Sequence, residues 1–214
     1  MTSVAIKICG ISTPDALDAA IAARADFIGL VFFPPSPRNV DGHAAAALAA
    51  RAGSSIGRVG LFVDADDGLI AESVRAGRLD AIQLHGEETP ERVAQVKDRF
   101  GLPVWKAIPV ATAKDVENVQ AYRGIADLLL FDARTPKDAA LPGGMGLSFD
   151  WSLLSGWRGR PGWGLAGGLS PANVADALER TGAPLLDTSS GVETAPGQKD
   201  PELIRAFCDA ARNA

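Results

Sequence analysis

The sequence predicts an α/β protein whose residues 1–214 form a single (β/α)8 barrel, the architecture called a TIM barrel. Short apolar runs alternate with alanine-rich amphipathic segments along the whole chain, and there are eight of each. Strict alternation of strand and helix implies a parallel sheet with right-handed crossovers. The rival is an open doubly wound sheet, which usually stops at five or six strands and would leave units unused. Eight units without a dividing linker therefore favour the closed barrel.

The expected strands are short runs rich in Val, Ile, Leu or Phe, residue types that are enriched in buried parallel strands. They cover residues 4–9, 27–32, 57–63, 80–85, 103–108, 127–132, 162–167 and 184–188.

The segments between these runs carry helix start and stop signals. Thr13 before Pro14 is typical of a helix N-terminus, and Gly77 and Gly101 stand where a helix would end. The expected helices cover residues 13–24, 41–53, 66–77, 89–101, 112–124, 148–156, 170–182 and 200–214. The segment 148–156 has the weakest helical pattern of the eight.

Composition and charge exclude several classes of protein. Lys and Arg number 21 against 26 Asp and Glu, for a formal net charge of −5, which argues against bulk binding of nucleic acid. No apolar stretch is long enough to span a membrane, and the first residues do not have the pattern of a signal peptide. We therefore expect a cytoplasmic protein with neither nucleic acid nor membrane as a partner.

No recognised metal or nucleotide motif occurs in the sequence. CxxC, HExxH, the P-loop and GxGxxG are all absent, so we expect neither a metal nor another cofactor. The two cysteines, Cys9 and Cys208, do not form the framework of a disulfide-rich fold, and Cys208 is expected to be a buried apolar residue of the last helix.

Polar side chains stand at the ends of the expected strands. Enzymes with this fold place their active sites at the carboxyl ends of the strands. Cys9 ends the first strand, Arg38 follows the second, His85 ends the fourth, Asp132 the sixth and Asp187 the eighth. We expect these five side chains to meet at one rim of the barrel and to form the active site.

Two glycine-rich turns follow the last two strands. Gly167-Gly168 follow the seventh strand, and Ser189-Ser190-Gly191 follow the eighth. Glycine lets a backbone approach a ligand, and amides at a helix N-terminus favour an anion. Because the loops after strands seven and eight are the usual phosphate site of this fold, we expect a phosphorylated small molecule as the ligand.

Seven segments carry a resemblance to a known family. They are KICGIS (7–12), ADFIGLVFFPPSPRNV (25–40), VGLFVD (59–64), DAIQLHGEE (80–88), LLFDA (129–133), LAGGLSPANV (165–174) and LDTSSGVETAPGQKD (186–200). By these segments the chain resembles phosphoribosylanthranilate isomerase, a family of tryptophan biosynthesis. The resemblance implies an Amadori rearrangement of N-(5-phosphoribosyl)anthranilate to 1-(2-carboxyphenylamino)-1-deoxyribulose 5-phosphate without a cofactor.

The resemblance also implies a role for each residue of the rim. Cys9 would be the general base and Asp132 the general acid, while Arg38 would hold the anthranilate carboxylate. His85 and Asp187 would support the site. The phosphate would lie in the loops that contain Gly167, Gly168, Ser189, Ser190 and Gly191. The chain departs from the family at Met145, where a polar residue is expected in the loop after the sixth strand.

The reaction sets requirements on the two catalytic groups. Asp132 must carry a proton to act as an acid, and its apolar context LLLF predicts burial that would favour the neutral form. Cys9 must become a thiolate. Lys7 lies two residues before Cys9 and therefore faces the same side of the strand, so we hypothesise that its charge assists Cys9.

Other readings of the same residues stay open. One is a neighbouring phosphosugar barrel enzyme such as indole-glycerol-phosphate synthase, whose chemistry would need a lysine acid and a glutamate partner. Others are a thiol enzyme that uses Cys9 and a non-catalytic protein that binds a phosphosugar. The sequence does not decide between a monomer and a homodimer, nor whether a second, related aminoaldose is accepted.

Overall fold

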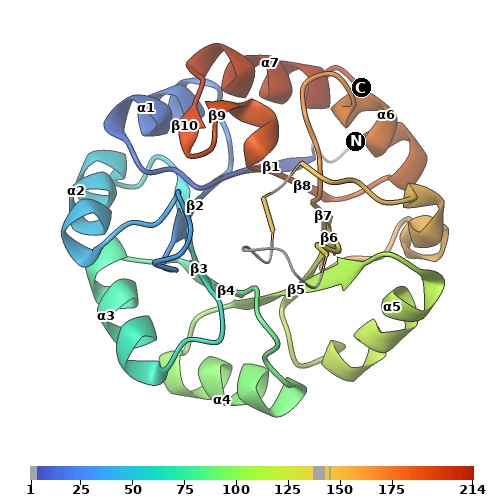
Figure 1. Ribbon diagram of the computed structural model, residues 1–214, viewed down its shortest axis with the longest axis horizontal. Coiled ribbons are helices and arrows are strands. Elements are labelled where there is room, and N and C mark those ends of the chain that lie inside the picture. Colours follow the sequence, from blue (N-terminus) through green and yellow to red (C-terminus); the bar gives the residue numbers. More distant parts are fainter. Residues whose placement is uncertain (1–3, 137–142, 145) are drawn as a thin grey trace.

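The computed structural model describes residues 4–136, 143–144 and 146–214. Eight parallel strands form a closed barrel in chain order, and β8 pairs with β1 to complete it (Figure 1). They are β1 (Ala5–Cys9), β2 (Phe27–Val31), β3 (Gly57–Phe62), β4 (Ala81–Leu84), β5 (Val104–Val110), β6 (Leu128–Ala133), β7 (Trp163–Leu165) and β8 (Leu185–Thr188). The predicted barrel and its eight strands are confirmed, with boundaries that differ by three residues or fewer.

Helices surround the barrel on its outside (Figure 1). They are α1 (Pro14–Ala22), α2 (Gly42–Ala52), α3 (Asp67–Gly77), α4 (Pro90–Phe100), α5 (Ala113–Asn118), α6 (Val174–Thr181) and α7 (Pro201–Arg212). The predicted Thr-Pro start is confirmed, because the Thr13 side chain accepts a hydrogen bond from Ala16 N at 3.3 Å. Across the described ranges, no helix is long and apolar enough to cross a membrane.

Three predicted helices differ from the structure. The segment 148–156 forms the 3₁₀ helix η2 (Trp151–Trp157), and residues 112–124 divide into α5 and the 3₁₀ helix η1 (Val119–Tyr122). In η2 the buried residues Trp151, Leu154 and Trp157 recur at a spacing of three, which aligns them along one side of a 3₁₀ helix, whereas they would drift around the axis of an α-helix. The apolar period of this segment therefore matches the helix type that forms.

The seventh predicted helix begins four residues later than expected, at Val174 instead of Ser170. The Asn173 side chain accepts a hydrogen bond from Ser170 N at 2.8 Å and donates one to Gly168 O at 2.9 Å. These bonds hold residues 170–173 in an irregular turn, so the backbone joins the helix only after Asn173.

A small antiparallel hairpin follows β8 and was not predicted. The 3₁₀ helix η3 (Ser190–Val192) leads into β9 (Glu193–Ala195) and β10 (Gln198–Lys199). Pro196 and Gly197 form the turn, and Gly197 adopts a φ of +81°, which glycine accepts without strain. The proline-glycine pair is the sequence signal that could have located this hairpin.

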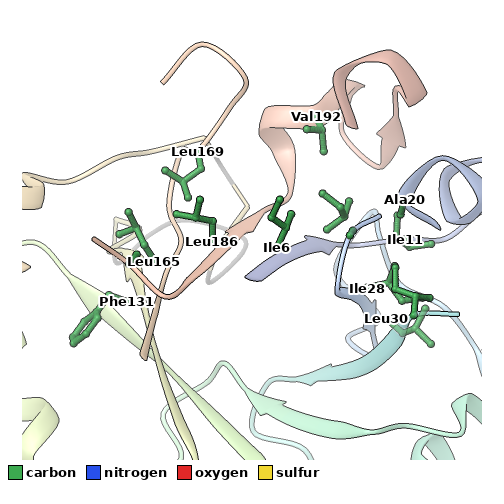
Figure 2. Close-up of a cluster of buried hydrophobic side chains, with 14 of the residues drawn as sticks. Ile6, Ile11, Ala20, Ile28, Leu30, Phe131, Leu165, Leu169, Leu186 and Val192 are labelled. Atoms are coloured by element: carbon green, nitrogen blue, oxygen red, sulfur yellow. The ribbon is translucent and has the colours of Figure 1, made fainter. Parts of the chain in front are cut away.

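The alternation of side chains in β1 separates the core from the site. Ile6 and Ile8 are fully buried in the main apolar cluster between the strands and the helices, part of which Figure 2 shows. Successive side chains of a strand point to opposite faces, so Lys7 and Cys9 point into the barrel. Cys9 accordingly belongs to a separate cluster at the mouth, with Val31 and Leu61.

An aspartate precedes each of three strands and closes the opposite end of the barrel. Each carboxylate accepts a hydrogen bond from a backbone N–H at the start of the preceding strand. The three bonds, each 2.8 Å long, join Ile6 N to Asp26, Arg58 N to Asp80 and Val104 N to Asp127. They connect β1 with β2, β3 with β4 and β5 with β6 in equivalent positions.

We predict that Asp26→Ala lowers the free energy of unfolding by about 1–2 kcal/mol, because it removes a charge-assisted hydrogen bond to Ile6 N. Asp26→Asn keeps an oxygen acceptor of the same shape and should lose less. Urea unfolding of the three proteins provides the measurement. An alanine variant as stable as the parent would mean that water replaces the carboxylate at no loss.

Candidate active site

A pocket opens at the carboxyl ends of the strands, where the sequence predicted the site. All five rim residues line it, namely Cys9, Arg38, His85, Asp132 and Asp187. Of the loop residues expected to bind phosphate, Gly167, Gly168, Ser189 and Ser190 also line the pocket. The structure therefore brings nine of the ten predicted site residues to one cavity.

Gly191 is the exception among the predicted site residues, because it does not line the pocket. A Cβ atom built on Gly191 would lie 1.9 Å from Leu169 O, a distance that no side chain tolerates. The loops after β7 and β8 therefore pack backbone against backbone at this point. The glycine permits that close approach, which is a role in shaping the loop.

A buried ion pair lies at the floor of the pocket. Lys7 Nζ donates to both carboxylate oxygens of Asp187, each at 3.0 Å, and Lys7 is completely buried. The Cys9 sulfur lies beside Lys7, since a Cβ built on Gly29 would be 2.7 Å from Cys9 Sγ and 3.1 Å from Lys7 Nζ. The expectation that Lys7 and Cys9 share a face of β1 is confirmed.

Burial and charge act in opposite directions on Cys9. Burial raises the pKa of the Cys9 thiol above its ordinary value, and the positive charge of Lys7 opposes this without cancelling it. Asp187 adds to the rise, while Lys199 counteracts it. The pKa of Lys7 itself is raised, because Asp187 and Cys9 outweigh the effect of its burial. Lys7 therefore keeps its charge next to the thiol.

Asp132 and His85 form a second pair at the rim. Asp132 Oδ2 lies 3.2 Å from His85 Nε2, and Asp132 Oδ1 accepts a hydrogen bond from Ala133 N at 2.8 Å. The Asp132 side chain is largely buried, with only 13% of it exposed, but its surroundings are not the apolar ones that LLLF predicted. Alternation along β6 turns Phe131 toward the helices, so the carboxyl meets polar groups instead.

Gln83 orients His85 and was not among the predicted site residues. Gln83 Nε2 lies 3.0 Å from His85 Nδ1, so an amide N–H donated there leaves the imidazole proton on Nε2, which faces Asp132. Gln83 is completely buried and lines the pocket, and its Oε1 atom has no hydrogen-bond partner among the described residues. A glutamine inside the apolar run DAIQLH was the available sequence signal.

A buried ion pair beneath His85 fixes the turn that follows it. Lys106 Nζ lies 2.9 Å from Glu88 Oε2 and donates to Gly86 O at 2.7 Å. The Glu88 carboxylate in turn accepts hydrogen bonds from Gly86 N at 2.9 Å and Asp64 N at 3.0 Å. These contacts hold the backbone directly after His85 in one conformation.

Arg38 is engaged by a carboxylate of the protein itself. Its Nε and Nη2 atoms donate to the two oxygens of Glu193, each at 2.8 Å, and Nη2 also donates to Gly144 O at 3.1 Å. The sequence predicted that the fork of Arg38 would receive the carboxylate of a ligand. The structure shows that the Nε–Nη2 edge of this fork is already occupied.

Gly143, in the loop after β6, lies beside the Asp132–His85 pair. A Cβ built on Gly143 would lie 2.9 Å from His85 Nε2 and 3.2 Å from Asp132 Oδ2. Glycine at this position therefore leaves the two polar atoms uncovered by a side chain. Met145, where the sequence departs from the expected pattern, lies outside the described residues.

The arrangement supplies acid and base groups at one cavity. A thiol beside a buried ammonium ion comes from β1, and a carboxyl on β6 lies close to an imidazole that directly follows β4. Within residues 4–136, 143–144 and 146–214, no group of three or more His, Cys, Asp or Glu side chains has the arrangement of a metal site. Such a pair of groups suits proton transfer to and from a small anionic ligand.

Comparison with known proteins gives concordant results. The family model described as N-(5'phosphoribosyl)anthranilate (PRA) isomerase matches residues 6–210. A relative of that name from Paramagnetospirillum magneticum is 54% identical over 209 residues, which cover 98% of this chain and 97% of the relative.

Two solved structures share the fold over almost their whole length. The crystal structure of phosphoribosyl anthranilate isomerase from Thermotoga maritima has a TM-score of 0.88 at 34% identity, covering 99% of this chain and 100% of that one. A crystal structure of a phosphoribosyl anthranilate isomerase in complex with reduced 1-(o-carboxyphenylamino)-1-deoxyribulose 5-phosphate has a TM-score of 0.86 at 32% identity, with the same coverage.

We predict opposite shifts of the Cys9 titration for two variants of the ion pair. Lys7→Met removes the charge that favours the thiolate and should raise the pKa of Cys9, whereas Asp187→Asn removes the charge that opposes it and should lower that pKa. Ultraviolet absorbance of the thiolate measures both. A Cys208→Ala background isolates the signal, because burial raises the pKa of Cys208 to about 11.

Circular dichroism checks that both variants fold, since each breaks a buried ion pair. If both titrated at the midpoint of the parent protein, the Lys7 charge would have no influence on Cys9.

Proposed function

The chain belongs to the N-(5'-phosphoribosyl)anthranilate isomerase family, and we propose that it converts N-(5-phosphoribosyl)anthranilate into 1-(2-carboxyphenylamino)-1-deoxyribulose 5-phosphate in tryptophan biosynthesis. The observation that carries this proposal is the meeting of Cys9 and Asp132 at one pocket, each with a polar partner. The complex of a structural relative with a reduced form of this product supports it.

Asp132 acts as the general acid of the first step. It gives its proton to the ring oxygen of the ribose, so that the C–O bond breaks and a protonated Schiff base forms. The carboxylate left behind accepts a hydrogen bond from Ala133 N, and Nε2 of His85 lies 3.2 Å from its other oxygen. These two donors stabilise the negative charge as it develops on Asp132, which lowers the barrier to transfer.

Cys9 acts as the general base of the second step. Its thiolate removes the proton from the sugar carbon next to the imine, and the electron pair moves to the iminium nitrogen to give an enolamine. The enolamine then relaxes to the ketone. A raised pKa makes the Cys9 thiolate a stronger base but a less populated one, and Lys7 stabilises it when it forms.

The remaining pocket residues hold the two anionic ends of the substrate. Arg38 binds the anthranilate carboxylate, and the loops with Gly167, Gly168, Ser189 and Ser190 bind the phosphate. Gly191 contributes by letting the second of these loops pack against the first. Asp187 keeps Lys7 in place below the sugar.

Five wider predictions complete the proposal. The chain works without a cofactor, as a monomer or homodimer in the cytoplasm. Residues 1–214 act as one barrel domain. The phosphorylated substrate is its small-molecule partner.

We predict that Cys9→Ser and Asp132→Asn each reduce turnover of N-(5-phosphoribosyl)anthranilate by about 10²- to 10⁴-fold, because each removes one proton-transfer group. Loss of the fluorescence of the substrate follows the reaction. Cys208→Ala is the matched control, since Cys208 is buried in α7 away from the pocket and should keep its turnover.

Circular dichroism shows whether the variants fold. A folded parent protein that binds the substrate without turning it over would overturn the proposed reaction and leave a phosphosugar-binding protein. Variants as active as the parent would overturn the roles of Cys9 and Asp132 alone.

A further inference from the structure

We infer that Glu193, held by Lys199, is a positioning residue for Arg38. It orients the guanidinium group so that Nη1 meets the carboxylate of the substrate. The enzyme thereby selects substrates whose aromatic ring carries a carboxylate. This inference rests on the proposed function, in which Arg38 receives the anthranilate carboxylate. Neither Glu193 nor Lys199 transfers a proton in that reaction. Both come from the β9–β10 hairpin.

Glu193 fixes the orientation of the guanidinium group. The two hydrogen bonds of 2.8 Å from Nε and Nη2 of Arg38 form a planar bidentate pair, the most directional contact that an arginine makes. The side chains of Arg38 and Glu193 are only 6% and 4% exposed, so water competes little for them. The guanidinium plane therefore cannot turn without breaking both bonds.

Contacts with two glycines restrict the rest of the Arg38 side chain. A Cβ built on Gly10 would lie 2.5 Å from Arg38 Cδ, so the aliphatic stem rests directly on the backbone there. A Cβ built on Gly144 would lie 2.7 Å from Nη1, which places Nη1 beside a residue that lines the pocket. Nη1 makes no hydrogen bond within the described part of the chain, and it is the donor left for a ligand.

Lys199 holds Glu193 from the other side. Its Nζ atom lies 2.6 Å from Glu193 Oε1 and donates to Ser189 O at 3.0 Å, and its side chain is 1% exposed. The hydroxyl of Ser189 in turn donates to Cys9 O at 3.1 Å. The hairpin therefore joins the carboxylate-binding Arg38 to the phosphate loop and to the end of β1.

Charge balance explains why the cluster around Glu193 contains two cations, Arg38 and Lys199. A buried arginine requires an anionic partner, but Glu193 alone would cancel its charge toward a ligand. Lys199 restores one net positive charge to the cluster, which then attracts an anion. Burial alone would raise the pKa of Glu193, but the contacts with Arg38 and Lys199 outweigh burial and hold this pKa below its usual range. Glu193 is therefore ionised.

A positioning role predicts a loss of selectivity. If Glu193 only stabilised the fold, its removal would impair every substrate equally. If it aims Arg38, its removal harms a substrate with a carboxylate and spares one without it. The ratio of the two kcat/KM values therefore separates these roles, and the loss should fall mainly on KM because the carboxylate lies away from the reacting atoms.

The test compares N-(5-phosphoribosyl)anthranilate with N-(5-phosphoribosyl)aniline, which lacks the carboxylate. Glu193→Gln keeps the shape of the side chain but removes the charge that holds Arg38. We expect the preference for the anthranilate substrate to fall by about 10-fold or more, since a charge-assisted contact is lost. Chromatography of the products measures both reactions.

Two further variants make the test decisive. Glu202→Gln is the matched control, because Glu202 is exposed on α7 and pairs only with Arg205 in the described residues, so its ratio should equal that of the parent. Lys199→Met provides a second measurement if Glu193→Gln does not fold. It leaves Arg38 and Glu193 as a neutral pair, so the preference should also fall.

The outcomes distinguish this inference from the proposed function. A lower ratio in the Glu193 or Lys199 variant supports the positioning role. Equal losses with both substrates overturn it and leave Glu193 a structural residue. A parent protein that uses both substrates equally well overturns the contact between Arg38 and the carboxylate. A parent protein that turns over neither substrate overturns the proposed function itself.

Discussion

The ion pair between Lys7 and Asp187 lies at the seam that closes the barrel. The two residues face each other in the register of β1 and β8, the first and last strands of the barrel, and both side chains point into the interior. Charges buried this deeply are unfavourable unless each is fully satisfied by a partner. Both oxygens of Asp187 lie 3.0 Å from Lys7 Nζ, so the two buried charges satisfy each other. Apolar side chains at these two positions could also fill the interior, so closure of the barrel does not itself require the ion pair. What the pair adds is a fixed positive charge beside Cys9.

Most of the fold follows from two features of the sequence. Apolar runs of four to eight residues predict parallel strands, and the side-chain period of two then decides which residues face the interior. That rule alone places Lys7 next to Cys9. Parallel closure also brings the ends of β1, β4, β6 and β8 to one rim, which is why Cys9, His85, Asp132 and Asp187 were predictable as a group. The predictions that rest on these rules agree with the structure.

The residues that sequence reasoning missed depend on contacts between segments far apart in the chain. Glu193 and Lys199 lie on strands of three and two residues, which are too short to show an alternating pattern. Their importance appears only when the hairpin meets Arg38, 155 residues away from Glu193. Gln83 offered a clearer signal, a polar residue within an apolar run. The 3₁₀ helix at Trp151–Trp157 was also readable, from apolar residues spaced by three.

The two proposed proton-transfer groups occupy opposite environments, and this difference suits their tasks. Cys9 is buried, and its charged neighbours Lys7, Asp187 and Lys199 act on it in opposing directions, so that its thiolate forms reluctantly and is strongly basic. Asp132 lies at the rim, where Ala133 N and the imidazole of His85 can stabilise the carboxylate that remains after proton loss. The substrate, held by its phosphate and its carboxylate, reaches both Asp132 and Cys9. Asp132 must act first, because ring opening creates the iminium ion that makes the neighbouring carbon acidic. The order of the two steps thus follows from the chemistry of the substrate, while the barrel only has to hold both groups in reach.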